Sequence, residues 1–282
     1  MSIEFDQRKI PGRHRIHYRV LDAHRDFPER EVEVLATREE IEAFVRDGYL
    51  VREELIPEAE LERLRAAFDQ VLAQDDRLEH GGDDFGGTFA RHLEDKHPVF
   101  FELVEFAPIL SVVRAILGPS VAVRGITGRV CGAGQQKLET EWHFHQRVIP
   151  DPLPPLFTHP HTVDTLVYLD RVTTENGPLC LLPGSHQQIH AEYQRRDFSD
   201  RPNQVVLHPR AGTLVFTHGN LFHRSLPTLP GCSVRRMVIV GFGACWLKPS
   251  IYGKKPADGL TARALESADA AQRELLGVAG YN

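Results

Sequence analysis

The sequence predicts a mainly β fold with flanking helices. Residues 37–74 and 98–117 carry apolar side chains at helical spacing, and Gly118-Pro119 then gives a strong stop signal. From residue 121 to residue 246, short apolar runs are separated by turn residues, as expected for β-strands. The chain of 282 residues is 41% hydrophobic, which is enough for one large domain with a substantial core. The expected architecture is therefore a double-stranded β-helix, a cupin-like jelly roll, with helices packed outside it.

The elements are expected in this order. Residues 1–35 form an N-terminal extension with a strand pattern at residues 16–20; this extension covers the barrel, helps to form a homo-oligomer or packs loosely. Residues 36–282 form a single domain. It starts with two amphipathic helices in residues 37–74, followed by a glycine-rich connector or lid at residues 81–87. After the β-rich part, residues 261–276 are predicted to form one more surface helix.

Three histidines form a candidate metal site. In an extended strand, His143 and His145 would point to the same face and present two imidazoles to one ion. His223 is a candidate third ligand, since it follows a buried strand at residues 214–216 and a turn at residues 219–220. A second strand is expected to begin near His223 and to continue through residues 235–242. The His-x-His pattern alone is weak evidence in a chain with 15 histidines.

The surroundings of these histidines resemble the phytanoyl-CoA dioxygenase family of Fe(II)/2-oxoglutarate-dependent oxygenases. The resemblance covers about residues 36–246 and rests on residues 140–143, 175–179, 183–186, 212–216, 223 and 235–242. It implies His143 and His223 as iron ligands, and Arg235 as the anchor of the far carboxylate of 2-oxoglutarate. Arginine suits that role because its planar guanidinium forms two parallel hydrogen bonds to a carboxylate.

Other residues are weaker candidates for contacts to 2-oxoglutarate. Arg236 competes with Arg235, but the interval from Arg235 to Phe242 matches the interval usual in the family. Arg129 and Thr165 are further candidates, although a strand-edge charge and a β-branched strand residue are equally good interpretations.

The sequence departs from the family pattern at His145, where relatives have an aspartate. With one carboxylate ligand Fe(II) has a formal charge of +1, whereas three neutral imidazoles leave it at +2, so slower or altered oxygen chemistry is expected. Glu141 is the second choice for the vacant ligand position, and Asp164 lies in a strand that the sequence cannot place. His145 could also be an orienting residue that does not ligate the metal.

The segment of residues 147–161 contains five prolines and leaves directly from the predicted metal strand. Such a segment forms a semi-rigid loop, and it is expected to border the substrate pocket. Arg147 is a candidate partner for an anionic substrate group, and Arg195-Arg196 is an equal candidate. Surface positions are the preferred interpretation for His159 and His161.

The composition excludes several classes of function. The net charge of −6 argues against a general nucleic-acid binder. The N-terminus lacks the apolar core of a signal peptide, and no segment is long enough to span a membrane, so the cytoplasm is the expected location. The four cysteines form no CxxC pair, and buried free thiols are expected.

The resemblance to the family, together with the three histidines, implies an Fe(II)- and 2-oxoglutarate-dependent dioxygenase that uses O2 to hydroxylate or otherwise oxidise a small organic molecule. Two alternatives remain: a three-histidine metalloenzyme that works without 2-oxoglutarate, and a catalytically inactive ligand-binding barrel.

Overall fold

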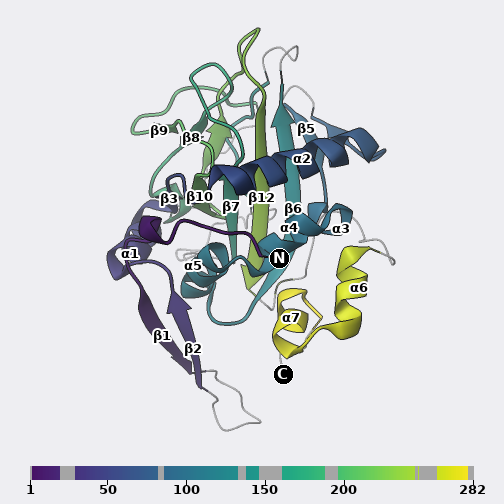
Figure 1. The fold of residues 1–282 in the computed structure, drawn as a ribbon. Helices are drawn as coiled ribbons and strands as arrows, with labels where there is room; N and C mark the ends of the chain where they lie inside the picture. The colour runs from purple at the N-terminus through teal and green to yellow at the C-terminus, as the bar shows by residue number, and fades with distance from the viewer. Residues whose placement is uncertain are drawn as a thin grey trace.

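The computed structural model describes residues 2–19, 29–81, 86–132, 138–145, 161–187, 196–244, 247 and 259–278. Its largest element is a seven-stranded antiparallel sheet, whose strands in spatial order are β3 (Tyr49–Arg52), β10 (Leu214–His218), β7 (Thr162–Tyr168), β12 (Arg235–Ala244), β6 (Val121–Cys131), β5 (Thr88–Ala90) and β4 (Glu79–His80). A smaller antiparallel sheet consists of β11 (His223–Ser225), β8 (Leu179–Leu181) and β9 (Val205–Leu207). The prediction of a mainly β fold with flanking helices is confirmed (Figure 1).

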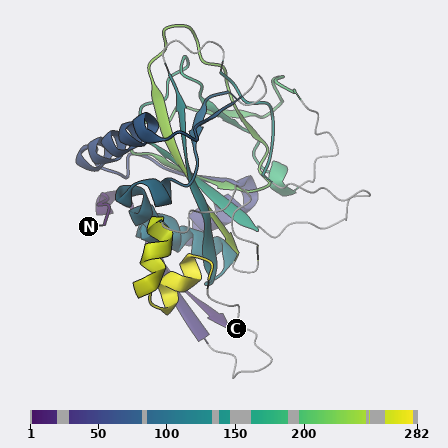
Figure 2. The same ribbon diagram turned by 90° about the vertical axis from the view of Figure 1, so that its right-hand side faces the viewer.

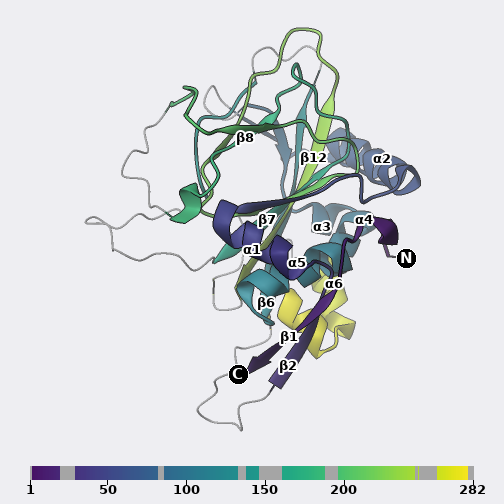
Figure 3. The same cartoon turned by 90° about the vertical axis from the view of Figure 1, so that its left-hand side faces the viewer.

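The two faces of the large sheet have different partners. Helices α2 (Glu58–Gln74), α4 (Pro98–Phe101) and α5 (Ala107–Leu117) cover one face, and the small sheet lies against the other (Figure 3). The alternation of β7 explains this arrangement: Val163 and Val167 pack in the helix-side core, while Leu166 and Tyr168 pack between the two sheets. Both faces of the central strands are therefore buried.

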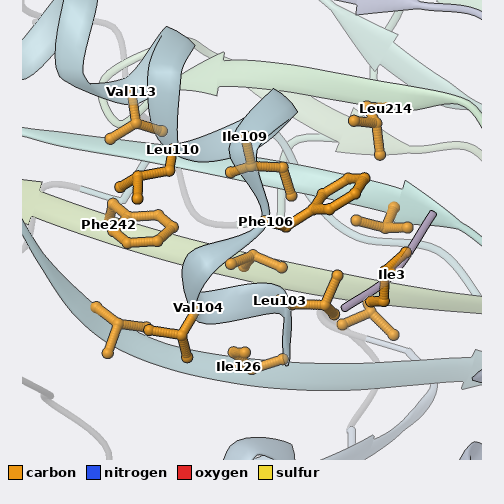
Figure 4. Packing of buried hydrophobic residues seen from close by; sticks show 14 of the residues in the cluster. Ile3, Leu103, Val104, Phe106, Ile109, Leu110, Val113, Ile126, Leu214 and Phe242 are labelled. Carbon is orange, nitrogen blue, oxygen red and sulfur yellow. The ribbon is translucent and has the colours of Figure 1, made fainter. Parts of the chain in front are cut away.

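The helix-side core is formed largely by α5 and the 3₁₀ turn η2 (Glu102–Glu105) that precedes it. Phe106 and Ile109 lie over the large sheet, in one cluster with Phe242 of β12 and Ile126 of β6 (Figure 4). Ile3, from the start of the chain, joins the same cluster and is 4% exposed. The N-terminal segment therefore takes part in the core that supports the β-barrel.

Helix α1 (Arg38–Asp47) connects this core to β3 and has well-defined ends. Thr37 and Glu40 form a capping box in which each side chain bonds the other residue's backbone N–H. At the other end, Gly48 adopts φ +84°, a left-handed conformation that glycine reaches without strain. The two predicted helices within residues 37–74 are confirmed as α1 and α2.

Strands β1 (His14–Arg19) and β2 (Glu29–Val34) form a separate two-stranded sheet, which confirms the strand predicted at residues 16–20. Arg30 of β2 forms an ion pair with Glu274 of α7 (Ala270–Leu275), at an N–O distance of 2.8 Å. Figure 2 shows this sheet beside the C-terminal helices.

Two predicted elements were wrong in detail. Residues 261–276 form two helices, α6 (Leu260–Ser267) and α7, because Ala268 is extended and Asp269 starts a new capping box with Gln272. The strand expected to run from His223 through residue 242 is instead two strands, β11 and β12, that lie in different sheets. The chain therefore crosses from the small sheet to the large one between Ser225 and Arg235.

The remaining short elements are α3 (Leu93–Lys96), η1 (Gln7–Lys9) and η3 (Ser185–Gln187). Within the described ranges, no helix is long and apolar enough to cross a membrane.

Candidate active site

The three histidines of the predicted metal site converge. One potential donor atom from each of His143, His145 and His223 lies within 4.8 Å of the other two. His143 and His223 exchange two backbone hydrogen bonds of 3.0 Å in an isolated β-bridge, so His143 extends the small sheet beyond β11. The backbone N–H of His145 donates to Gly219 O at 2.7 Å, which fixes His145 beside the turn after β10. The extended strand predicted through His143 and His145 is therefore wrong, and separate backbone contacts of the two residues bring their rings together.

Hydrogen bonds determine which ring nitrogen of His143 and of His223 is available to bind a metal ion. His143 Nδ1 lies 2.8 Å from Glu141 O, and His223 Nδ1 lies 2.8 Å from Leu221 O. A carbonyl oxygen can only accept, so each Nδ1 carries the proton and each Nε2 carries the lone pair. This arrangement of a bonded Nδ1 and a basic Nε2 is usual for histidines that bind metals.

Burial keeps two of these rings neutral. It lowers the pKa of His223 to about 3, and it holds the pKa of His143 well below its ordinary value, with further lowering from the neighbouring His223 and His145. A metal ligand must be deprotonated, so these imidazoles are ready to bind an ion at neutral pH.

His145 has a different partner. Its Nδ1 is hydrogen-bonded to Asp164 Oδ2, a carboxylate on β7. Burial alone would raise the pKa of Asp164, but His145 and Arg124 together hold it below its ordinary value. Asp164 is therefore ionised and accepts a hydrogen bond from His145 Nδ1–H, which leaves Nε2 as the ring nitrogen of His145 with the lone pair.

The histidines line a pocket between the two sheets, together with two arginines of the large sheet. Arg235 of β12 is 2% exposed; it donates to Gly177 O and to Cys131 Sγ, and its Nε has no hydrogen-bond partner among the described residues. Within the described part of the chain, Arg235 forms no ion pair with a carboxylate. A buried, unpaired cation is costly, so the pocket favours an anion beside Arg235.

Arg129 of β6 adds a second positive charge to the lining of this pocket. It donates to Gly86 O at 2.5 Å, and its guanidinium lies 5.6 Å from the centre of the Phe89 ring. Burial and the nearby Arg235 lower the pKa of Arg129 to about 10, so Arg129 remains charged at neutral pH. Burial would raise the pKa of the adjacent Cys131 thiol, but the two arginines lower it overall.

The other predicted residues lie elsewhere. Arg236 points away from the pocket and pairs with Asp69 and Asp170 at 2.8 and 3.0 Å. Thr165 is fully buried on the opposite face of β7 from Asp164, so the structure does not bring it to the pocket. The Glu141 carboxylate accepts a hydrogen bond from the backbone N–H of Arg196 and is not part of the histidine group.

Several predictions concern residues outside the described ranges. They are the substrate contacts of Arg147 and Arg195, the surface position of His159 and most of the proline-rich loop. They stay predictions.

Sequence reasoning missed Tyr168 as a pocket residue. Burial raises the pKa of Tyr168 to about 12, so its hydroxyl stays protonated. The alternation of Asp164, Leu166 and Tyr168 along β7 was the available signal, because residues two apart share a face.

A sequence model of the phytanoyl-CoA dioxygenase (PhyH) family matches residues 44–237, more than half of the chain. The chain belongs to this family. Among curated relatives, the ectoine dioxygenase of Halomonas elongata is 29% identical over an alignment of 159 residues, and the match covers 52% of this chain and 45% of that protein. The ectoine dioxygenase of Sphingopyxis alaskensis is 28% identical over an alignment of 162 residues, and the match covers 51% of this chain and 48% of that protein. The chain spans about half the length of these relatives.

Solved structures of other enzymes show the same fold. The non-haem, α-ketoglutarate-dependent carbocyclase SnoK from nogalamycin biosynthesis has a TM-score of 0.62 and 22% identity, covering 79% of this chain and 93% of SnoK. HygX from Streptomyces hygroscopicus, with nickel, 2-oxoglutarate and hygromycin B bound, has a TM-score of 0.61 and 20% identity, covering 76% of this chain and 89% of HygX. These likenesses support the jelly-roll description of the PhyH-family chain.

Proposed function

We propose that this protein is an Fe(II)- and 2-oxoglutarate-dependent dioxygenase that oxidises a small organic molecule. One observation carries the proposal: three imidazoles converge in a pocket that also holds Arg235, which is buried and forms no ion pair with a carboxylate of the described residues. Membership of the PhyH family supports it, and so do the ectoine dioxygenases and the 2-oxoglutarate-bound HygX.

The residues present fit an iron ion. Imidazole nitrogen is a suitable ligand for Fe(II), and His143, His145 and His223 would hold it through their Nε2 atoms. Bound Fe(II) would supply coordination positions for the keto acid and O2. The electrons that reduce O2 would come from Fe(II) together with the keto acid, which would be oxidised to succinate and CO2. The interacting partners of the protein would then be 2-oxoglutarate, O2 and the small-molecule substrate.

The protein's own residues position the co-substrate. Arg235 would bind the far carboxylate of 2-oxoglutarate in a bidentate contact, and Arg129 would add a second positive charge to the pocket. Leu166, Met237 and Ile239 line the same pocket and limit the access of water. Exclusion of solvent strengthens the attraction between Arg235 and the carboxylate.

An anaerobic titration of the Fe(II)-loaded protein with 2-oxoglutarate tests this function. Visible absorption should show a saturable charge-transfer band of the chelated keto acid. The band should be absent in His223→Ala and weakened in Arg235→Ala, whereas His208→Ala, an exposed histidine outside the pocket, should keep it.

The other outcomes favour the two alternative functions. Bound iron without a band would favour a three-histidine enzyme that works without 2-oxoglutarate. No iron binding would favour a ligand-binding barrel that has lost catalysis.

A further inference from the structure

The Asp164 side chain is mostly buried and contacts Nδ1 of His145. Asp164 lies on the pocket face of β7, between β10 and β12, and its side chain has His145 as its hydrogen-bond and ion-pair partner in the described structure. The backbone oxygen of Asp164 accepts a 3.0 Å hydrogen bond from Thr217 Oγ1, which fixes the strand at this point. The carboxylate is thus directed at the imidazole by its own strand and by its neighbour.

The strand opposite Asp164 leaves room for its side chain. Gly241 of β12 is its register partner, and a Cβ atom at residue 241 would lie 2.8 Å from Asp164 Oδ1. Contacts that short require the neighbouring atoms to move. A glycine at position 241 is therefore needed for Asp164 to reach His145 in its present rotamer.

We propose that Asp164 is a positioning residue that holds His145 as the third metal ligand and supplies the negative charge that this site lacks among its direct ligands. The proposal rests on the function proposed above. The donor atoms of the three histidines lie within 4.8 Å of one another, and Asp164 is not part of that group, so it acts through His145. Carboxylates that bind the outer nitrogen of a metal-ligating histidine orient the ring and raise its basicity.

The charge balance follows from this arrangement. An Fe(II) ion with three neutral imidazoles has a formal charge of +2, and Asp164 in contact with one imidazole lowers the total to +1. A site with two histidines and one carboxylate has the same total. The histidine at position 145 is then expected to change the oxygen chemistry less. The negative charge that a ligating aspartate would bring is supplied instead by Asp164, which contacts His145 and not the metal.

Metal affinity tests the proposal without turnover. Co(II) binding is measured by calorimetry, in the absence of 2-oxoglutarate, for the wild type, Asp164→Asn, His145→Asp and the double variant. Asp164→Asn keeps the size of the side chain but removes its charge, and it should weaken Co(II) binding by about 10- to 100-fold. In the His145→Asp background, where no imidazole needs orienting, the same change should weaken binding by less than about threefold.

A count of coordinated nitrogens separates the two possible positions of the carboxylate. Pulsed EPR of the Cu(II)-loaded wild type should show three imidazoles, and His145→Asp should show two. Two imidazoles in the wild type, with binding lost in Asp164→Ala, would make Asp164 itself a ligand and overturn the proposal while leaving the metal site intact. An equal effect of Asp164→Asn in both backgrounds would also overturn it, and no metal binding by the wild type would overturn both proposals.

A variant outside the site gives an independent test. Gly241→Ala should push the Asp164 side chain away from His145 and weaken Co(II) binding by roughly tenfold, although no ligand has changed. Gly132→Ala is the control, because a Cβ at that position would lie 3.9 Å from Val234 Cγ2, an ordinary van der Waals contact. Equal affinities of the two variants would contradict the role of Asp164.

Discussion

Arg235 and Arg236 are adjacent in sequence, yet they meet opposite electrostatic surroundings. Strand alternation places Arg235 in the pocket, where no carboxylate of the described residues pairs with it, and it places Arg236 on the helix side against Asp69 and Asp170. Of these two arginines, Arg235 is therefore the one placed to pair with an anion that enters the pocket, whereas Arg236 would first have to break an ion pair.

Replacement of each arginine by lysine tests this distinction. Arg235→Lys should weaken 2-oxoglutarate binding about 10- to 100-fold, because lysine keeps the charge but loses the bidentate geometry. Anaerobic titration of the Fe(II)-loaded variants measures the change. Arg236→Lys should bind 2-oxoglutarate as the wild type does; a comparable loss in both variants would refute the assignment of Arg235.

Some residues of the site can be predicted from the sequence, and others cannot. His143, His223 and Arg235 stand in recognisable surroundings, so their convergence in one pocket could be anticipated. The pairing of His145 with Asp164 could not, since it depends on which strands are neighbours. Thr165 shows a further limit. The sequence does not reveal which face of β7 borders the pocket, so residues 164 and 165 were both reasonable candidates for the pocket.

At the scale of elements, a capping box fixes the start of helix α1. The Thr37 hydroxyl accepts a hydrogen bond from Glu40 N, and the Glu40 carboxylate bonds Thr37 N and also pairs with Arg52 of β3. Residues in the cap thus connect the helix to the edge strand of the large sheet.

Thr37→Ala should reduce the free energy of unfolding by about 1 kcal/mol, because one backbone N–H at the helix start loses its acceptor. Urea denaturation measures the effect. Glu42→Ala, at an exposed position of the same helix, should change stability by less than about 0.5 kcal/mol. If the two variants were equally stable, the capping box would have no energetic role.

Element boundaries were predictable where such signals were strong. Gly118 follows α5, as the stop signal at Gly118-Pro119 indicates. The break between α6 and α7 depends on Asp269 capping a new helix within a continuous apolar pattern, and periodicity does not report such a cap. The separation of β11 from β12 was not predictable, because apolar strands give no information on the sheet that they join.

At the scale of the whole molecule, residues before the family match contribute to the core. Phe5 packs edge-on against Phe106 with ring centroids 5.7 Å apart, and Asp6 N donates to Leu55 O at 2.9 Å. Tyr18 of β1 donates a hydrogen bond to Arg114 O of α5 at 2.9 Å. We expect the N-terminal extension to unfold together with the domain.

Ile3→Ala should therefore lower the stability of the entire protein by about 2–5 kcal/mol, the usual cost of truncating a buried isoleucine. Thermal unfolding followed at the near-ultraviolet signal of the tryptophans reports the change. Glu4→Ala, at the exposed neighbouring position, is the control and should leave the midpoint nearly unchanged. A stable Ile3→Ala variant would indicate that residues 1–35 are a separable extension.

The crossing of the chain between Ser225 and Arg235 has a thermodynamic consequence. His223 belongs to the small sheet and Arg235 to the large one, so a metal chelate that contacts both would brace the two sheets against each other. A ligand bound only by the folded state stabilises it by about 4 kcal/mol at a concentration a thousandfold above its Kd. The loaded protein would then resist opening of the barrel, and the two sheets would separate most easily when the co-substrate is scarce.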